Sequence, residues 1–298
     1  MTALLVALVL GLTAAAAWGA PAAQAATAAP APAPMPMPSN GAGDTVYFIK
    51  GYTPDGISCR SKWKAATRAM RAWGWTGRFE RVGLYAADTR RQGCTVNLRD
   101  PKPERGTVDI PIKDLGKALA WNIYNKYSSK GKSVDIVGHS MGGLIARAAI
   151  AGYQRHEQGW PPLLYVEDVV TLGTPHKGAL AVTANDRQAQ DMRPWSAFMS
   201  WLGRTPNPQA EGGTDWTAIG SHADAAVPTE STTPVWDGFA HLVRYDMFEW
   251  LSHKDLRITT RGTYSMSYFN RGAGWRDTAR GAAPIRAAMH ALYWARRW

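Results

Sequence analysis

The chain has 298 residues, of which 45% are hydrophobic and 19% are charged, so it can bury a large core and is not a disordered chain. The formal net charge is +11, but Lys and Arg are scattered along the sequence, which argues against a basic tail or stripe for nucleic acid. We interpret the excess as solvated surface that also favours contact with anionic lipid or cell-wall polymer at low salt.

The chain begins with an apolar, uncharged run, TALLVALVLGLTAAAAWGA, followed by the small-x-small triplet AQA. This pattern predicts a secretory signal peptide over residues 1–25, with a membrane anchor as the alternative. Residues 26–43 alternate proline with small residues and predict a polyproline linker or tail that cannot join a core. We therefore expect a secreted protein with one folded domain over residues 44–298.

The two cysteines, Cys59 and Cys94, both lie early in the expected domain. Export would oxidise them, so we predict one disulfide. Closing that loop stabilises a fold by about 3 to 4 kcal/mol in the chain-entropy account. A cysteine nucleophile is the weaker alternative, because neither cysteine lies in a turn with a suitable neighbour.

Apolar runs and helical spacings alternate along the expected domain. Strands are predicted at 45–50, 78–88, 134–137, 166–173 and 215–221, and helices after residue 61, over 114–127 and over 144–152. Ser61 is the expected cap of the first helix. Strands separated by helices predict an α/β fold with a mostly parallel sheet, covered on both faces, whose chemistry lies at the carboxyl ends of the strands.

The segment VDIVGHSMGG, residues 134–143, places a Gly-x-Ser-x-Gly motif between a predicted strand and a predicted helix. A turn this sharp requires glycine on both sides of the serine and exposes the hydroxyl at the edge of the sheet, near the positive end of the helix. The motif predicts Ser140 as a nucleophile. The alternative is a tight strand-to-helix turn without chemistry.

Together with VVTLGTPHKG at 169–178, this segment resembles the α/β-hydrolase superfamily, specifically its secreted bacterial lipases and esterases. The resemblance extends from about Thr45 to His253. It implies an α/β-hydrolase fold and the cleavage of an ester or lipid, with a lipid–water interface as one place of action. It calls for no cofactor, and nothing in the sequence identifies ligands for the calcium ion that some related lipases carry. We expect a monomer without a nucleic-acid partner.

A nucleophilic serine needs a base and an acid, expected in the chain order serine, acid, histidine. The loop SHADAAVP resembles the acid loop of these enzymes and implies Asp224 as the acid. The stretch at 250–256 resembles their histidine loop and implies His253 as the base. The alternatives are Asp215 and Glu230 for the acid, and His241 and His290 for the base.

The oxyanion of acyl transfer needs two N–H donors, one from Met141 and one from the loop after the first strand. The second donor is expected to be Tyr52, in a loop where lipases usually carry His-Gly and this chain carries Lys50-Gly51. Two other functions are compatible with these residues. One is acyl or peptidyl transfer by the same triad, and the other is a non-catalytic binding protein that retains the fold.

Residues 177–215 are rich in Pro, Gly and Trp and weakly periodic, which predicts a lid over an apolar cleft. The segment DMRPWSAFMSWL within it resembles the lid region of the lipases, with tryptophan where they often carry glycine. Four of its side chains are expected either to line an acyl-binding groove or to bury the lid on the body: Trp195, Phe198, Met199 and Trp201.

Overall fold

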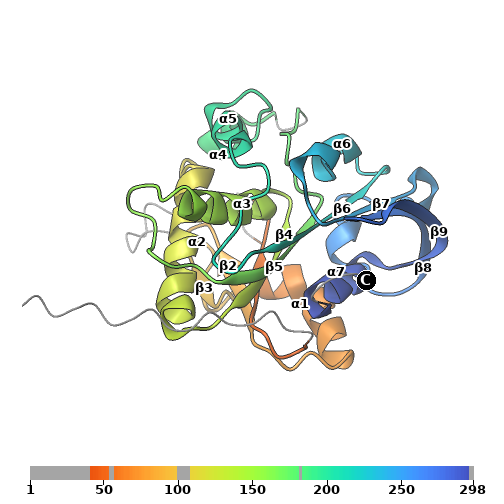
Figure 1. Ribbon diagram of the computed structural model, residues 1–298, viewed down its shortest axis with the longest axis horizontal. Coiled ribbons are helices and arrows are strands. Elements are labelled where there is room, and N and C mark those ends of the chain that lie inside the picture. The colour runs from red at the N-terminus through yellow and green to blue at the C-terminus, as the bar shows by residue number, and fades with distance from the viewer. Residues whose placement is uncertain (1–40, 54–56, 99–107, 181–182, 295–298) are drawn as a thin grey trace, which may run out of the picture. The chain divides into compact units, whose positions relative to one another are not determined.

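The computed structural model describes residues 41–53, 57–98, 108–180 and 183–294 (Figure 1). The expected signal peptide, most of the expected linker and the last four residues of the expected domain lie outside these ranges. Among the described residues, no helix combines the length and the apolar character needed to cross a membrane.

The described residues form a sheet in the order β3-β2-β1-β4-β5-β6-β7-β8-β9. The neighbours from β3 to β7 are parallel, which confirms the mostly parallel sheet, whereas β8 and β9 join antiparallel. The strands are β1 (Val46–Ile49), β2 (Phe79–Gly83), β3 (Val96–Asn97), β4 (Val134–His139), β5 (Val166–Leu172), β6 (Asp215–Ser221), β7 (His241–Tyr245), β8 (Thr263–Asn270) and β9 (Gly274–Ala282).

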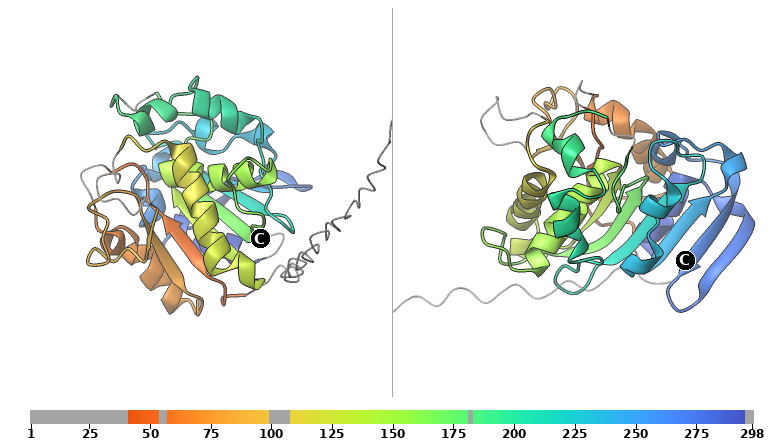
Figure 2. Two further views of the ribbon diagram at one scale, coloured as in Figure 1. Left: turned by 90° about the vertical axis from the view of Figure 1, so that its left-hand side faces the viewer. Right: turned by 90° about the horizontal axis from the view of Figure 1, so that it is seen from above.

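Helices cover both faces of the sheet (Figures 1 and 2). One face carries α2 (Ile112–Lys126) and α3 (Met141–Gln154), and the other carries α1 (Cys59–Ala72) and α7 (Pro284–Tyr293). Successive side chains of a strand point to opposite faces, so Tyr47 of β1 joins the core beneath α2 and α3 while Phe48 joins the core beneath α1 and α7. Burial on both sides explains why these strands are apolar throughout.

Three shorter helices follow the carboxyl ends of β5 and β6, where the site is expected. They are α4 (Arg187–Asp191), α5 (Ala197–Gly203) and α6 (Thr229–Thr232). The first two belong to the expected lid, and α5 contacts α3 (Figure 1). Single 3-10 turns lie at Ser128–Lys130, Val235–Asp237, Met247–Glu249 and Asp255–Arg257.

Helix α1 begins earlier than its sequence predicts. Ser58 is the N-cap, and its side chain accepts the N–H of Ser61 at 3.4 Å. Ser61, the expected cap, therefore lies inside the first turn, because the helix already starts at Cys59. Trp63 and Met70 of this helix are buried and face the core.

The hairpin of β8 and β9 was not predicted. It extends the sheet beyond β7 and leaves β9 as an open edge (Figure 1). Met266 is the buried residue of β8, whereas Arg276, Asp277 and Arg280 of β9 are exposed. With so few buried positions the hairpin lacks the apolar alternation that identifies a strand in a sequence.

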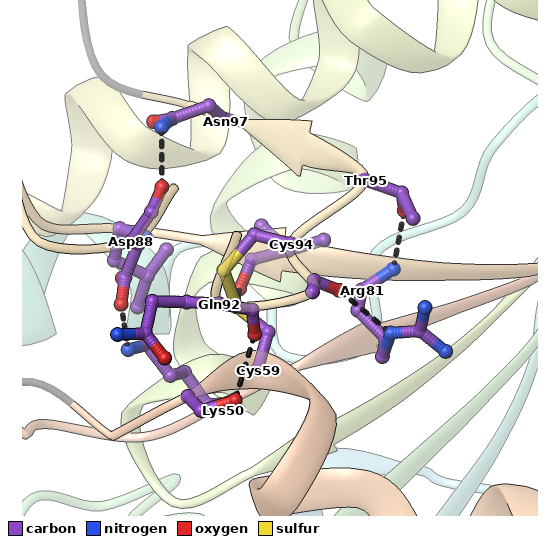
Figure 3. The surroundings of a disulfide bond; sticks show 12 residues. Lys50, Cys59, Arg81, Asp88, Gln92, Cys94, Thr95 and Asn97 are labelled. Carbon is purple, nitrogen blue, oxygen red and sulfur yellow. Dashed lines mark hydrogen bonds and ion pairs between the residues drawn. A yellow bond between two sulfur atoms is a disulfide. The ribbon is translucent and has the colours of Figure 1, made fainter. Parts of the chain in front are cut away.

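The predicted disulfide between Cys59 and Cys94 is confirmed (Figure 3). It joins the start of α1 to the segment before β3, across a sequence separation of 35 residues. Both cysteines are buried, so the bond also contributes to the packing between α1 and β2.

Replacing both cysteines, as Cys59→Ala with Cys94→Ala, should lower the free energy of unfolding by about 3 to 4 kcal/mol, because the unfolded chain regains the entropy of the open loop. Urea unfolding followed by tryptophan fluorescence under non-reducing conditions measures the loss. Adding reductant should weaken the wild type by a similar amount and leave the double variant unchanged. Equal unfolding midpoints for both proteins would contradict the prediction.

Candidate active site

Ser140 occupies the single position between β4 and α3. Its φ of 56° and ψ of −129° lie where residues with a side chain are rarely found, and holding them costs conformational energy. Two hydrogen bonds fix the turn: the Ser140 N–H donates to Leu172 O at 2.9 Å, and Thr174 Oγ1 donates to Ser140 O at 2.9 Å. The neighbouring strand β5 and the loop after it therefore hold the serine in this conformation.

The loop after β1 lies directly against this turn. A Cβ atom on Gly142 would stand 2.2 Å from Ile49 O, and one on Gly51 would stand 2.6 Å from Ser140 Cβ. Glycine is required at both positions, since any larger residue would push the loop and the turn apart. Tyr52 follows Gly51, so the two expected oxyanion donors, Tyr52 and Met141, each adjoin a residue of this contact.

Asp224 and His253 meet in the structure. Asp224 follows β6 and His253 follows β7, and the distance between Asp224 Oδ2 and His253 Nδ1 is 2.7 Å. The other carboxylate oxygen of Asp224 accepts the N–H groups of Ala226 at 2.8 Å and Val227 at 3.1 Å. The Asp224 side chain is fully buried, whereas His253 is partly exposed. A carboxylate on Nδ1 leaves Nε2 of the ring available as a proton acceptor.

Gly173 brings this pair to the serine turn. A Cβ on Gly173 would lie 3.0 Å from His253 Nδ1 and 3.2 Å from Asp224 Oδ2. The preceding residue, Leu172, is the one that accepts the N–H of Ser140. The three expected triad residues therefore surround the carboxyl end of β5. Ser140 Oγ and His253 make no hydrogen bond within the described residues, and in many enzymes this bond tightens only in the substrate complex.

His139 positions the histidine loop, a role that was not predicted from the sequence. His139 Nε2 lies 2.8 Å from the backbone oxygen of His253, and the two rings are 4.6 Å apart. A carbonyl can only accept, so Nε2 carries the proton and donates. Burial, and then the nearby His253, lower the pKa of His139 well below its usual value, so the ring is neutral. No sequence signal identifies this contact, because the partner is a backbone atom.

His241, which could have been the base by chain order, lies elsewhere. It is the first residue of β7, at the amino end of a strand parallel to its neighbours, so it is at the edge opposite Ser140. Its Nε2 lies 3.2 Å from Asp215 Oδ2 and its Nδ1 lies 2.5 Å from Asn270 Oδ1. Asp215, a second candidate for the acid, is thus paired with His241 rather than with His253.

His290 and Glu230, the remaining candidates for the base and the acid, are separate from the Asp224–His253 pair. His290 lies on α7, where its Nε2 accepts a hydrogen bond from Arg286 Nε at 3.0 Å. Glu230 is an exposed residue of α6.

The expected substrate-binding residues of the lid divide into two groups. Phe198, Met199 and Trp201 are buried in the core that includes α2 and α3, and the Trp201 indole donates to Glu157 at 2.6 Å. Trp195 is 72% exposed. Three of the four side chains therefore bury the lid on the body, and one faces solvent.

The lid is also fastened to the loop after β1. Tyr52 donates its hydroxyl to Asp186, the N-cap of α4, and the Tyr85 hydroxyl donates to Gln188 Oε1 at 2.9 Å. Tyr85 in turn accepts the N–H of Thr53 at 3.3 Å. The loop that carries the expected oxyanion donor and the first lid helix therefore form one hydrogen-bonded unit.

The GTPHKG segment anchors the base of the lid. Lys177 forms an ion pair with the buried Asp237, which also pairs with the buried Arg147 at 2.9 Å. Arg147 donates to His176 O at 3.2 Å, and burial, with Arg147 beside it, lowers the pKa of His176 well below its usual value. A neutral His176 and a cluster in which both cations pair with Asp237 indicate a structural role for this segment.

Of the described residues, one group of His, Cys, Asp and Glu side chains is compact enough for a metal ion: Cys59, Asp88 and Cys94. Both sulfur atoms belong to the disulfide, and Asp88 is paired with Lys50 at 2.5 Å. The donor set therefore does not suit a metal, since a bound cysteine would have to be a thiolate.

Residues 115–193 match the family of the PGAP1-like alpha/beta domain. This range includes β4, the Ser140 turn, α3 and β5. No curated protein matches the chain significantly.

Several solved structures are similar to part of the chain. The mature lipase BlEst2 of Bacillus licheniformis is 20% identical, with a TM-score of 0.44 over 67% of this chain and 82% of that chain. Lipase B of Aspergillus fumigatus is 14% identical, with a TM-score of 0.47 over 75% of this chain and 52% of that one. The product of gene lin2722 of Listeria innocua is 15% identical, with a TM-score of 0.47 over 72% and 88%. The mostly parallel sheet with helices on both faces is that of an α/β-hydrolase fold, and residues 115–193 within it match the PGAP1-like alpha/beta domain.

Proposed function

We propose that the protein is a serine hydrolase that cleaves carboxylic esters through an acyl-enzyme on Ser140. The observation that supports this most is the Asp224–His253 pair at 2.7 Å, packed on Gly173 beside the strained turn of Ser140. A buried carboxylate on a histidine beside a partly exposed serine is the arrangement that activates a hydroxyl.

In the proposed reaction, Ser140 Oγ attacks the ester carbonyl while His253 Nε2 accepts its proton. The N–H groups of Tyr52 and Met141 stabilise the oxyanion of the tetrahedral intermediate. His253 then gives the proton to the leaving alcohol, and the acyl group remains on Ser140. Water, deprotonated by His253, releases the acid in the second half of the reaction, while Asp224 stabilises the positively charged ring.

We propose an ester or lipid as the substrate, at a lipid–water interface, for a protein that is secreted and monomeric. The loop before His253 supports the interface, because Met247, Phe248 and Trp250 are 48%, 84% and 74% exposed. Side chains this apolar and this exposed are typical of surfaces that contact lipid or another protein. The confirmed disulfide is compatible with secretion.

The chain's Lys50, where lipases usually carry histidine, supports the oxyanion loop from beneath. Its Nζ is fully buried, lies 2.5 Å from Asp88 Oδ1 and donates to Ile57 O at 3.3 Å (Figure 3). Asp88 Oδ2 accepts the N–H groups of Leu84 at 2.7 Å and Tyr85 at 2.8 Å. The pair thus connects the loop after β1 to the loop after β2.

Lys62 is a second buried lysine and differs in having no acidic partner among the described residues. Burial, together with the nearby cations Arg257, Lys50 and Lys254, lowers the pKa of Lys62 to about 8. It provides a matched comparison for Lys50, because both side chains are buried and only one forms an ion pair.

The variant Ser140→Ala tests the nucleophile. Hydrolysis of a p-nitrophenyl ester should fall by about a million-fold in kcat, with an unchanged unfolding curve, because no acyl-enzyme can form. Equal rates for the variant and the wild type would exclude the proposal and leave a non-catalytic binding protein. An added alcohol that diverts the acyl group into a new ester would indicate acyl transfer instead of hydrolysis.

The base is tested by comparing His253→Ala with His241→Ala. The first should lose about as much activity as the serine variant, since the members of a triad act as a unit. The second should keep its activity per folded molecule and lose stability, because Asp215 would remain without its partner. The reverse result would assign the base to His241.

The variant Lys50→Met should lower the free energy of unfolding by about 3 to 5 kcal/mol, because Asp88 would remain buried without its cation. The matched variant Lys62→Met should be neutral or stabilising at pH 7, since it removes a charge that has no acidic partner among the described residues. Urea unfolding of both variants measures the difference. Equal changes in the free energy of unfolding for the two variants would mean that the burial of the lysine, and not its ion pair, determines the loss of stability.

The difference in stability between Lys62→Met and the wild type should depend on pH. An unfolded lysine keeps its proton up to about pH 10.4, whereas Lys62 in the fold loses it above about pH 8. A lowered pKa in the folded state costs stability below pH 8, and this cost shrinks as the pH rises toward 10. The stability advantage of Lys62→Met should therefore decrease between pH 8 and pH 10. A constant difference would contradict the lowered pKa.

A further inference from the structure

Six cationic side chains from two elements surround one open concavity of about 450 Å³. Lys and Arg are scattered along the sequence as a whole, but α1 places four cations on one side of a helix, and the fold brings Arg78 and Arg81 beside them. The lining consists of Arg60, Lys64, Thr67, Arg68 and Arg71 of α1 with Arg78, Phe79 and Arg81 at β2. None of the lining residues is acidic, and none belongs to the proposed catalytic machinery.

The cations of α1 form a row along one side of the helix. Arg60, Lys64, Arg68 and Arg71 follow one another at spacings of four, four and three residues, which places them on one face over about 16 Å. Like charges at these spacings destabilise a helix, and a cation in its first turn opposes the helix dipole. No acidic residue occurs in α1 to offset them.

Several of these charges are unbalanced. Arg60, Lys64 and Arg68 form no ion pair with any residue in the described ranges, whereas Arg78 pairs with Glu80 at 3.1 Å. Burial, and then the guanidinium of Arg60, lower the pKa of Arg81. The guanidinium groups therefore lie close together with no acidic side chain among the residues that line the concavity.

We propose that this concavity binds a linear phosphodiester polymer, with successive phosphates along the row of α1 cations. Five of the six cations are arginines, and the planar guanidinium matches a phosphate with two parallel hydrogen bonds. A row of anions on one chain satisfies the whole row of cations, which a single small anion cannot do.

The lining favours a polymer without bases over a nucleic acid. Single-stranded nucleic acids are held by aromatic faces on which bases stack. The one aromatic lining residue is Phe79, and the guanidinium of Arg71 already lies 4.0 Å from the centre of its ring.

Binding there would leave the proposed active site free. The concavity lies beside α1 and β2, whereas Ser140, Asp224 and His253 surround the carboxyl end of β5. The protein could thus be held on a polyanion while it hydrolyses an ester. This inference does not depend on the proposed function, because it concerns binding by other residues.

The test compares the wild type with the triple variant Arg60→Gln, Lys64→Gln, Arg68→Gln. The control variant Lys130→Gln, Lys132→Gln, Arg276→Gln removes three exposed charges elsewhere. The probe is a fluorescent phosphodiester oligomer with abasic sugar units, and fluorescence anisotropy gives the dissociation constant over a range of salt concentrations. A thymidine oligomer and a glutamate oligomer of matched length, and vesicles of anionic lipid, are measured beside it.

We expect the triple variant to bind the abasic oligomer at least about tenfold more weakly, and the slope of log K against log salt to decrease by about two to three. The control variant should bind almost as the wild type does. Ester hydrolysis should be the same in all three proteins, and Ser140→Ala should bind the oligomer normally, which separates this inference from the proposed function.

Three results would overturn the inference. Equal losses in the triple and control variants would mean that net charge alone drives binding. Much tighter binding of the thymidine or the glutamate oligomer than of the abasic oligomer would assign the concavity to a nucleic acid or to a carboxylate polymer. Binding to vesicles that needs the α1 cations, without binding to any oligomer, would make it a membrane contact.

Discussion

The backbone of Ser140 is held at a φ of 56°, and the rest of the site depends on keeping it there. The conformation persists because its N–H and its carbonyl are both bonded to the strand end of β5 and the residues after it. That same strand end carries Gly173, on which the Asp224–His253 pair packs. The carboxyl end of β5 and the residues after it therefore hold the strained backbone of Ser140 and also position Asp224 and His253 beside it.

The histidine is held from three sides at once. Asp224 orients the His253 ring through Nδ1, and His139 donates a hydrogen bond to the His253 backbone oxygen. Gly173 has no side chain, which leaves room for the His253 ring against the end of β5. His139 also lies inside the serine motif, so the residue before the proposed nucleophile determines where the proposed base can stand. A substitution at His139 would thus disturb two elements that are more than a hundred residues apart in the chain.

Sequence reasoning identified features that depend on local geometry. The strand, turn and helix around Ser140 and the buried strands follow from glycine spacing and apolar runs, and the disulfide follows from the number of cysteines. Asp224 and His253 required chain order and a family likeness. His139 and the Lys50–Asp88 pair could not be predicted, because each depends on side chains or carbonyl groups that only the folded sheet brings together. The row of cations on α1 has a helical spacing in the sequence, but its position beside Arg78 and Arg81 depends on the fold. The hairpin of β8 and β9 was missed because it buries few side chains.

That hairpin has a consequence for how copies of the protein meet. An open edge strand offers unpaired backbone groups to any other strand, which is a common route to aggregation. The edge here is β9, and if two such edges were joined antiparallel about the middle of the strand, the exposed Arg276 of one copy would face the exposed Arg280 of the other. The guanidinium groups would repel one another and lose their hydration. The last strand thus ends the sheet and also protects it from growing into a fibre.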